Sequence, residues 1–412
     1  MVRFQKEDVQ NSRKERDVKS CVPVADLSLV NSWLRKSLGC IALATSLGLA
    51  HCSTIIAAEP EISVLKKRGD DSVDTYRIPG LATTNAGTLI AVYDLRYQHA
   101  GDLPADVDVG MSRSTDNGAT WEPVKVILDF DKSVPDSKGN GVGDPAVLVD
   151  RKTGEIFVVA LWSFGNRSWH GSREGLTPQE TGQVVITRSK DDGLTWSEPI
   201  NITSQIKDPK WHLVFQGPGA GIQLQDGTLM FAAQYIAPDR NSHSCFIASK
   251  DHGETWSISA SPTTGKPKTS EAQIVELSDG SLLLSMRDET ELGQRLWAKY
   301  AYDQDLMKGA WAAPWSELPD PRCMASLTRH PSGALIFCNP GSPRHRVALT
   351  VRVSHDDGKT WSKGQVIDPA PSAYSCLTIL KDGSIAVLYE TGERSPYENL
   401  SFAKFSLEWA QQ

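Results

Sequence analysis

The chain has 412 residues, a formal net charge of −7 and 40% hydrophobic residues. This composition supplies enough apolar side chains for a large folded core. No long basic tract occurs outside the first residues, which gives nucleic-acid binding little support. We therefore expect a globular protein without a nucleic acid partner.

Residues 1–58 differ from the rest of the chain. The basic pair Arg35-Lys36 precedes a run of 13 mostly apolar residues, Leu38 to Ala50. Such a run is too short to span a bilayer, and its basic flank is typical of a secretory signal. We expect residues 1–58 to be a leader and residues 59–412 a mature chain without a transmembrane span. The protein is then secreted or periplasmic.

An octapeptide with the pattern Ser-x-Asp-x-Gly-x-Thr-Trp occurs four times, beginning at Ser114, Ser189, Ser249 and Ser354. In each copy the Asp carboxylate can accept hydrogen bonds from turn N–H groups and the Gly can take a positive φ. The Trp supplies an apolar anchor where the next strand begins. Because a catalytic group is needed only once, we interpret the octapeptide as a structural hairpin turn.

A second repeat alternates with the octapeptide, namely a turn that ends in glycine and is followed closely by an aliphatic residue. It occurs at Gly87, Gly154, Gly227, Gly280, Gly333 and Gly383. An octapeptide lies in every gap except the fourth, where Tyr302 to Trp311 is a candidate degenerate copy. One unit is therefore two hairpins, which is typical of a propeller blade. The sequence predicts an all-β fold, a six-bladed β-propeller of four-stranded antiparallel blades over residues 59–412.

Apolar segments such as Ile156–Trp162 and Ser281–Ser285 are expected as strands, and no long amphipathic helix is predicted. The last segment, Phe402 to Trp409, alternates like a final strand. We expect it to close the ring beside a strand at Glu61 to Lys66.

The expected mature chain contains the cysteines Cys245, Cys323, Cys338 and Cys376. In an exported protein they could form two disulfides, and Cys323 with Cys338 is the best single pair because the two flank the turn at Gly333. Free buried thiols are an equal alternative. The spacing matches no zinc pattern, and we expect no metal ion or cofactor. Lipid anchoring at Cys52 is not expected, because His51 stands where a small residue is required.

Ionisable residues recur at similar distances from the turn glycines. Those nine or ten residues before a turn are Arg77, Asp144, Glu271 and Tyr374, and those seven to nine residues after one are Arg96, Arg287 and Glu390. In equivalent hairpins equal offsets mean equal height, so these side chains should meet at the mouth opposite the turns. Several inward arginines favour an anionic ligand, with carboxylates holding the guanidinium groups.

These residues also carry a family resemblance. Tyr76-Arg77-Ile78-Pro79 resembles the motif that opens bacterial exo-sialidases (neuraminidases), and the octapeptides resemble the Asp boxes of that family. The resemblance extends from about Asp74 to Glu390. It implies a six-bladed propeller that removes terminal sialic acid from glycoproteins, glycolipids or oligosaccharides.

The resemblance also implies roles for substrate-binding residues. An arginine triad would bind the sialic acid carboxylate, one acid would orient the first arginine, and an auxiliary arginine and an aspartate would complete the site. The triad is Arg77, Arg287 and Arg346, and the acid that orients Arg77 is Glu390. The auxiliary arginine is Arg96 and the aspartate is Asp144.

Some of these assignments have competitors in the sequence. Arg344 and Arg352 compete with Arg346, which is favoured by its distance from the octapeptide at Ser354. For the acid/base residue, Asp106 and Asp108 compete with Asp102. A pocket for the acetyl methyl group could contain Trp162 and Trp169, and core packing is an equal alternative for Trp162.

The resemblance implies catalysis by Tyr374, Glu271 and Asp102. Sialic acid carries a carboxylate on its anomeric carbon, so a neutral phenol is a better nucleophile there than an anion. Glu271 would take the phenol proton, and Asp102 would protonate the leaving oxygen and later activate water. The predicted activity is a retaining exo-alpha-sialidase. The alternatives are a trans-sialidase and a non-catalytic Asp-box propeller that only binds.

Overall fold

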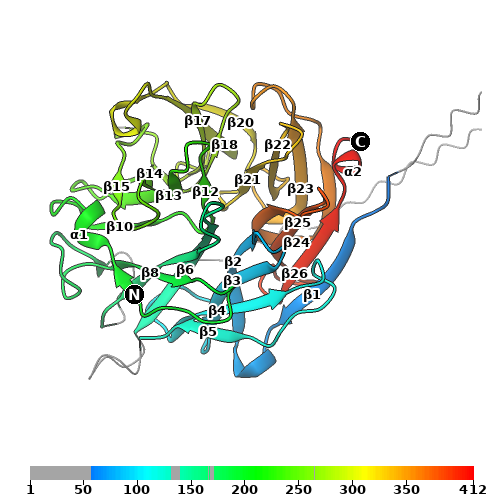
Figure 1. Cartoon of the computed structure of the whole chain (residues 1–412), viewed down its shortest axis with the longest axis horizontal. Coiled ribbons are helices and arrows are strands. Elements are labelled where there is room, and N and C mark those ends of the chain that lie inside the picture. Colours follow the sequence, from blue (N-terminus) through cyan, green and yellow to red (C-terminus); the bar gives the residue numbers. More distant parts are fainter. Residues whose placement is uncertain (1–56, 131–139, 166, 168–170, 264) are drawn as a thin grey trace, which may run out of the picture. The chain divides into compact units, whose positions relative to one another are not determined.

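The computed structural model describes residues 57–130, 140–165, 167, 171–263 and 265–412 (Figure 1). The predicted signal at Leu38 to Ala50 lies outside the described residues. Within them, no helix is long and apolar enough to cross a membrane.

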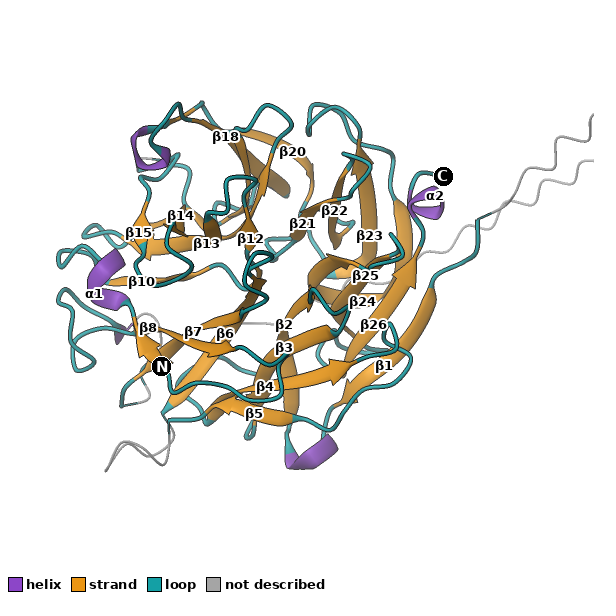
Figure 2. Ribbon diagram, in the orientation of Figure 1, coloured by secondary structure: helices purple, strands orange, loops and turns teal. Residues whose placement is uncertain are grey.

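The strands pair into antiparallel ladders that follow the chain order (Figure 2). The first ladder holds β2 (Thr75–Thr83), β3 (Leu89–Arg96), β4 (Val107–Ser114) and β5 (Lys125–Leu128). The second holds β6 (Gly141–Val149), β7 (Ile156–Ser163), β8 (Gln183–Ser189) and β9 (Ile200–Asn201), with β11 (Gly219–Ala220) parallel to β6. The third holds β10 (Leu213–Gln216), β13 (Leu229–Ile236), β14 (Ser242–Ser249) and β15 (Ser257–Ile258), with β12 (Ile222–Gln223) also on β13.

The later strands continue the same order. The fourth ladder holds β16 (Thr269–Glu276), β17 (Leu282–Asp288), β18 (Gln294–Ala301) and β19 (Ala310–Trp311), with β20 (Trp315–Pro319) also on β18. A seven-stranded sheet holds β21 (Ser326–Arg329), β22 (Leu335–Pro340), β23 (Val347–Ser354), β24 (Gln365–Ile379), β25 (Ile385–Thr391), β26 (Asn399–Phe405) and β1 (Glu61–Lys67). The first half of β24 pairs with β23 and its second half with β25, so this sheet contains two ladders.

Helical segments are short in the described part of the chain: η1 (Asp70–Ser72), α1 (Thr203–Ile206), η3 (Leu306–Lys308) and α2 (Leu407–Ala410). This confirms the all-β class. The expected strand cores are confirmed as well, because Ile156–Trp162 lies in β7 and β17 begins at Leu282. The arrangement of the ladders as six propeller blades stays a prediction.

The predicted turn glycines form hairpins between paired strands. Their φ angles are positive, from 79° at Gly154 and Gly280 to 97° at Gly227. Each of the six joins the first two strands of its ladder, or β12 to β13 in the third. These turns lie at one end of the ladders. The strand residues seven to ten positions before or after a turn therefore lie at the opposite end.

The octapeptides are structural turns, as interpreted. In the second copy Asp191 Oδ1 accepts from Thr195 N at 2.8 Å, and Gly193 N donates to Ser189 Oγ at 2.9 Å. The same bonds recur in the other three copies. The candidate degenerate copy forms a different turn, in which the Asp305 side chain accepts from Met307 N.

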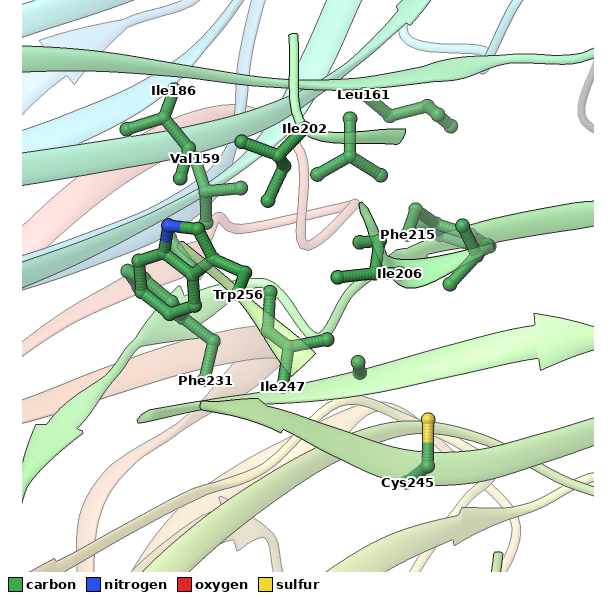
Figure 3. Packing of buried hydrophobic residues seen from close by; sticks show 14 of the residues in the cluster. Val159, Leu161, Ile186, Ile202, Ile206, Phe215, Phe231, Cys245, Ile247 and Trp256 are labelled. Atoms are coloured by element: carbon green, nitrogen blue, oxygen red, sulfur yellow. The ribbon is translucent and has the colours of Figure 1, made fainter. Parts of the chain in front are cut away.

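Each octapeptide also packs against the preceding ladder. A Cβ on Gly253 would lie 2.4 Å from Phe157 Cε1 in β7. Trp256 of the same octapeptide is 3% exposed and has its ring centroid 5.7 Å from that of Phe231 (Figure 3). The cluster in Figure 3 also contains Val159 and Ile186 of the second ladder and Ile247 of the third. The core therefore lies between neighbouring sheets.

The two ends of the described chain meet in one sheet, since β1 pairs antiparallel with β26 from Glu61↔Lys404 to Lys67↔Asn399. This pairing confirms the closure expected from the sequence. The bounds of the final strand were wrong: β26 ends at Phe405, and Trp409 lies in α2, whose first turn is capped by Ser406.

The predicted disulfide between Cys323 and Cys338 is wrong, because all four described cysteines are free and buried. The residue that pairs with Cys338 across the hairpin is Ser326. Cys323 lies three residues before Ser326 in the chain and is therefore not opposite Cys338. At roughly 3.3 Å per residue this offset exceeds the Cα separation that a disulfide spans. The alternative of free buried thiols is correct.

Candidate active site

A cavity of about 370 Å³ opens at the ends of the strands opposite the turn glycines. Six predicted site residues line it, namely Arg96, Asp102, Asp144, Glu271, Arg287 and Tyr374. The other three, Arg77, Arg346 and Glu390, contact Tyr374 or its backbone. The structure thus brings together all nine residues that the sequence singled out.

Breaks in strand register occur at this height in four ladders. The pairing shifts between Arg77 and Gly80 in β2, between Gly143 and Ala146 in β6, between Thr269 and Ala272 in β16, and between Ser372 and Ser375 in β24. Such bulges redirect side chains and are common beside active sites. Here they contain or adjoin Arg77, Asp144, Glu271 and Tyr374.

The centre of the site is a phenol held between a carboxylate and a guanidinium. Tyr374 Oη donates to Glu271 Oε1 at 2.5 Å, and Arg287 Nη1 donates to Tyr374 Oη at 3.0 Å. Arg287 Nη1 also donates to Glu271 Oε2 at 2.7 Å. Burial, followed by the charge of Glu271, raises the pKa of Tyr374 well above its ordinary value, although Arg287 and Arg346 oppose the shift. The phenol is therefore neutral and already aligned with a base.

Arg77 is fixed by a fully buried carboxylate. Its Nε lies 3.0 Å from Glu390 Oε1, and the same carboxylate accepts from the backbone N–H groups of Ile78 and Tyr374. Burial disfavours the Arg77 cation, but Glu390, Tyr397 and Tyr374 together outweigh burial and raise the pKa of Arg77 above its ordinary value. Glu390 thus connects β25 to both β2 and β24.

Arg96 and Asp102 form the opposite wall. Arg96 Nη1 donates to Asp102 Oδ1 at 2.8 Å, and Arg77 Nη1 lies 3.6 Å from the same oxygen. Burial alone would raise the pKa of Asp102, but Arg96 and then Arg77 outweigh it and lower that pKa. Asp102 is 67% exposed at its side chain, so it faces the cavity.

Sequence reasoning missed Asp94, which organises this wall. Asp94 is buried and accepts from Arg96 Nη2 at 2.9 Å and from the backbone N–H of Asp144 at 2.9 Å. Asp94 and Arg96 are two residues apart in β3 and so share a face of the strand. That spacing was the available signal. Burial, with the charges of Asp94 and Asp102 next, raises the pKa of Asp144 well above its ordinary value.

The structure separates Arg346 from its competitors. Arg346 Nη1 donates to Tyr397 Oη at 2.9 Å, and its guanidinium carbon lies 5.5 Å from the Tyr374 ring centroid. Arg352 is buried in β23 and bonds to Asn339 Oδ1 at 3.1 Å, and Arg344 is exposed. Tyr397, which the sequence analysis overlooked, also lies under Arg77, 4.3 Å from centroid to guanidinium carbon.

A third overlooked residue is Glu289. Its Oε1 lies 2.9 Å from Arg287 Nε, and its Oε2 accepts from Arg322 Nε at 2.7 Å. Glu289 follows Arg287 by two residues in the chain, the same spacing that relates Asp94 to Arg96. Two carboxylates, Glu271 and Glu289, therefore hold Arg287 from different atoms.

Of the two candidate tryptophans, Trp162 packs in the core, stacked on Phe130 with ring centroids 4.5 Å apart. Core packing was the open alternative for this residue. Trp169 lies outside the described residues. The apolar wall of the cavity is formed by Leu103, Val107, Leu161, Phe215 and Ile236.

Comparison with known proteins identifies the relatives of this chain. Residues 87–387 match the model of the BNR repeat-like domain. A sialidase of Bacteroides fragilis is 42% identical over 79% of this chain, which spans 62% of that relative's length. A sialidase of Paraclostridium sordellii is 30% identical, with 90% of this chain and 97% of the relative covered. The chain belongs to the sialidase family.

A solved structure agrees with this sialidase assignment. The Hadza microbial sialidase superposes with a TM-score of 0.78 at 42% identity, covering 85% of this chain and 69% of its own. The resemblance stated from Tyr76-Arg77-Ile78-Pro79 and the Asp boxes is thereby confirmed at the level of the family. In the present chain the pKa values of Asp102 and Asp144 shift in opposite directions, because Arg96 and Arg77 together outweigh burial at Asp102, whereas burial and neighbouring carboxylates dominate at Asp144.

Proposed function

We propose that this chain is a retaining exo-alpha-sialidase, which hydrolyses terminal sialic acid from glycoproteins, glycolipids and oligosaccharides. One observation carries the proposal: the 2.5 Å hydrogen bond from Tyr374 Oη to Glu271 Oε1 at the floor of a cavity rich in arginine. A buried phenol paired with a base is the arrangement that a neutral nucleophile requires.

The proposed binding step uses the three arginines around Tyr374. Arg287 donates to its hydroxyl, and the guanidinium carbons of Arg77 and Arg346 lie 5.3 and 5.5 Å from its ring centroid. A carboxylate bound by these groups would hold the anomeric carbon above Tyr374 Oη. Arginine forks suit a planar carboxylate, and Glu390 keeps Arg77 oriented before substrate arrives.

The proposed chemistry has two displacements. Tyr374 Oη attacks the anomeric carbon while Glu271 takes its proton and Asp102 protonates the departing sugar oxygen. Water then attacks the same carbon, Asp102 accepts a water proton, and Tyr374 leaves with the proton returned by Glu271. Two inversions give net retention. Asp102 is available for both transfers because its exposed carboxyl faces the cavity.

We also propose that the six ladders are the blades of a propeller. Contacts of β2 with β6, β6 with β12, β13 with β16, β16 with β21, β21 with β24, and β24 with β2 support a closed ring of ladders. For residues 1–58 we propose a cleaved leader and export, supported by the composition of the sequence alone.

The test is hydrolysis of 3′-sialyllactose by the purified chain, followed by NMR of the first-formed anomer. We expect free sialic acid with retained configuration. Tyr374→Phe should stay folded and bind a sialic acid analogue but lose most turnover, with residual product no longer strictly retained. Turnover should fall by at least about 10²–10⁴-fold, the range known for removal of a single positioned acid–base group.

Two results would redirect the proposal. A Tyr374→Phe enzyme with parental rate and full retention would remove Tyr374 from the mechanism. With a sialylated glycoprotein as the donor, transfer of sialic acid to excess lactose in place of release would favour a trans-sialidase, and neither product would favour a binding module.

A further inference from the structure

The cavity extends beyond the groups that the proposed mechanism uses. Its lining also includes Gln234, Arg240, Ser242 and Lys268. Arg240 lies in the loop between β13 and β14, and Lys268 directly precedes β16. Both positions are at the end of the strands opposite the turn glycines, like the candidate catalytic residues.

Among the described residues, Arg240 and Lys268 differ from the remaining cations of this cavity in their lack of carboxylate partners. Arg96, Arg287 and Arg322 are each held by carboxylates, at 2.9 Å from Asp94, 2.7 Å from Glu271 and 2.7 Å from Glu289. Within the described ranges, neither Arg240 nor Lys268 has an ion pair with a carboxylate. Asp239, which directly precedes Arg240 in the chain, accepts instead from the backbone N–H and the side-chain amide of Asn241.

A neutral donor lies on the same wall. Gln234 is 4% exposed and its Nε2 has no hydrogen-bond partner among the described residues, although the side chain lines the cavity. A buried amide N–H without a partner is costly unless a ligand or water completes it. Gln234, Arg240 and Lys268 together present donors and positive charge without a matching acceptor.

We propose that the part of the cavity wall formed by Gln234, Arg240 and Lys268 binds a second anionic group, a carboxylate or a sulfate ester, on the same glycan as the terminal sialic acid. The inference rests on the proposed function, since it assumes that a sialic acid occupies the arginine triad. It names the preferred substrate class: sialosides with two negative charges rather than one. The second charge can belong to the adjoining sugar or to a substituent of the terminal sugar, and both sources present the same chemistry to Arg240 and Lys268.

The test measures binding, so that it does not depend on turnover. Tyr374→Phe protein is titrated calorimetrically with 3′-sialyllactose, with α2,8-disialyllactose, which adds a carboxylate on the adjoining sugar, and with 8-O-sulfo-3′-sialyllactose, which adds a sulfate on the terminal sugar. We expect at least one doubly charged glycan to bind about tenfold more tightly than 3′-sialyllactose, as one charge-assisted contact would provide. The glycan that gains identifies the source of the second anion.

Paired variants locate the effect. In Arg240→Asn/Lys268→Gln the tenfold advantage should disappear while binding of 3′-sialyllactose changes less than twofold. Asn suits the positive φ of 60° at Arg240, and thermal unfolding checks that the fold is kept. The matched control, Lys190→Gln/Lys250→Gln, removes the same charge from exposed octapeptide positions at the other end of the ladders and should keep the advantage.

Equal affinity for all three glycans, or an equal loss in the control pair, would overturn the inference. The proposed function is judged separately, by hydrolysis of 3′-sialyllactose with the parent chain. Hydrolysis without a charge preference would reject only this subsite, and a charge preference without hydrolysis would reject only the hydrolase.

Discussion

Arg287 makes contacts through opposite parts of its guanidinium group. Nη1 donates to Tyr374 and Glu271, while Nε lies 2.9 Å from Glu289. A guanidinium held from two sides cannot turn away from the cavity, so its orientation is fixed before a ligand arrives. Such preorganisation lowers the cost of binding and of reaction. Glu289 is therefore a positioning residue for Arg287.

Replacing Glu289 with Gln should weaken this arrangement and leave the fold intact. We expect kcat/KM for 3′-sialyllactose to fall about tenfold, mostly through a higher KM, because the arginine keeps its charge but loses one charge-assisted contact. Steady-state kinetics measure the split between KM and kcat. Glu291→Gln is the matched control, since Glu291 also pairs with Arg322, at 3.0 Å, whereas the ion pairs of Arg287 among the described residues are with Glu271 and Glu289. Equal losses in the two variants would contradict the positioning role.

The lowered pKa of Asp102 predicts the direction of the pH dependence. Burial opposes the ionised form, but Arg96 and Arg77 prevail, so the protonated fraction of Asp102 in the free protein decreases as pH rises. For 3′-sialyllactose, whose leaving oxygen needs a proton, kcat/KM should fall between pH 5 and pH 7. An aryl sialoside with an acidic phenol needs less protonation and should show a shallower decline. Parallel profiles for the two substrates would exclude Asp102 as the acid.

At the scale of elements, each octapeptide connects its own ladder to the one before it. Besides the contact between Gly253 and Phe157, the residue that precedes the octapeptide glycine bonds to the earlier ladder: Asp192 accepts from Thr88 Oγ1 at 2.5 Å, and His252 Nδ1 lies 2.6 Å from Asp150 Oδ2. Each turn therefore stabilises an interface as well as its own hairpin. Repetition in the sequence predicted the turn but gave no indication of the interface.

A pair of glycine substitutions separates these two contributions. Gly253 and Gly280 have nearly equal φ angles, 82° and 79°, but a Cβ on Gly280 meets nothing within 4 Å. Gly280→Ala should lower the free energy of unfolding by about 1–2 kcal/mol, the cost of the left-handed backbone alone. Gly253→Ala should lose about 1–3 kcal/mol more, because its methyl group collides with Phe157. Denaturant unfolding measures both, and equal losses would show that the interface contributes nothing.

Hairpins could be predicted from the sequence because each turn needs a residue with a positive φ, and the recurring glycines mark those positions. The bulges at Asp144 and Glu271 could not, since a bulge depends on how two strands pair and has no residue signature here. Equal offsets from the turns still gave the right height for Arg77 and Tyr374. Tyr397 was missed because it lies on a loop, where the direction of a side chain follows from tertiary contacts.

At the scale of the whole molecule, the order of the ladders follows the order of the chain except at the closure. The pairing of β1 with β26 was foreseen, whereas the end of β26 and the state of Cys323 and Cys338 were not. Burial raises the pKa of each of these two thiols to about 12, so they are packed as small apolar groups. Sequence distance to a turn fixes a height on the strand but does not bring two Cβ atoms together.

The pairing of β1 with β26 also has a consequence for synthesis on the ribosome, because the two strands are made at different times. Glu61 is made early and its partner Lys404 roughly 340 residues later, so β1 waits about 20–70 s for β26 at common elongation rates. During that interval it is an unpaired strand beside many other nascent chains. Its composition suits the wait: Glu61, Lys66 and Lys67 place charges at both ends of the strand, a feature that discourages edge-to-edge association. The charged residues of β1 thus also disfavour pairing with other chains before β26 has been made.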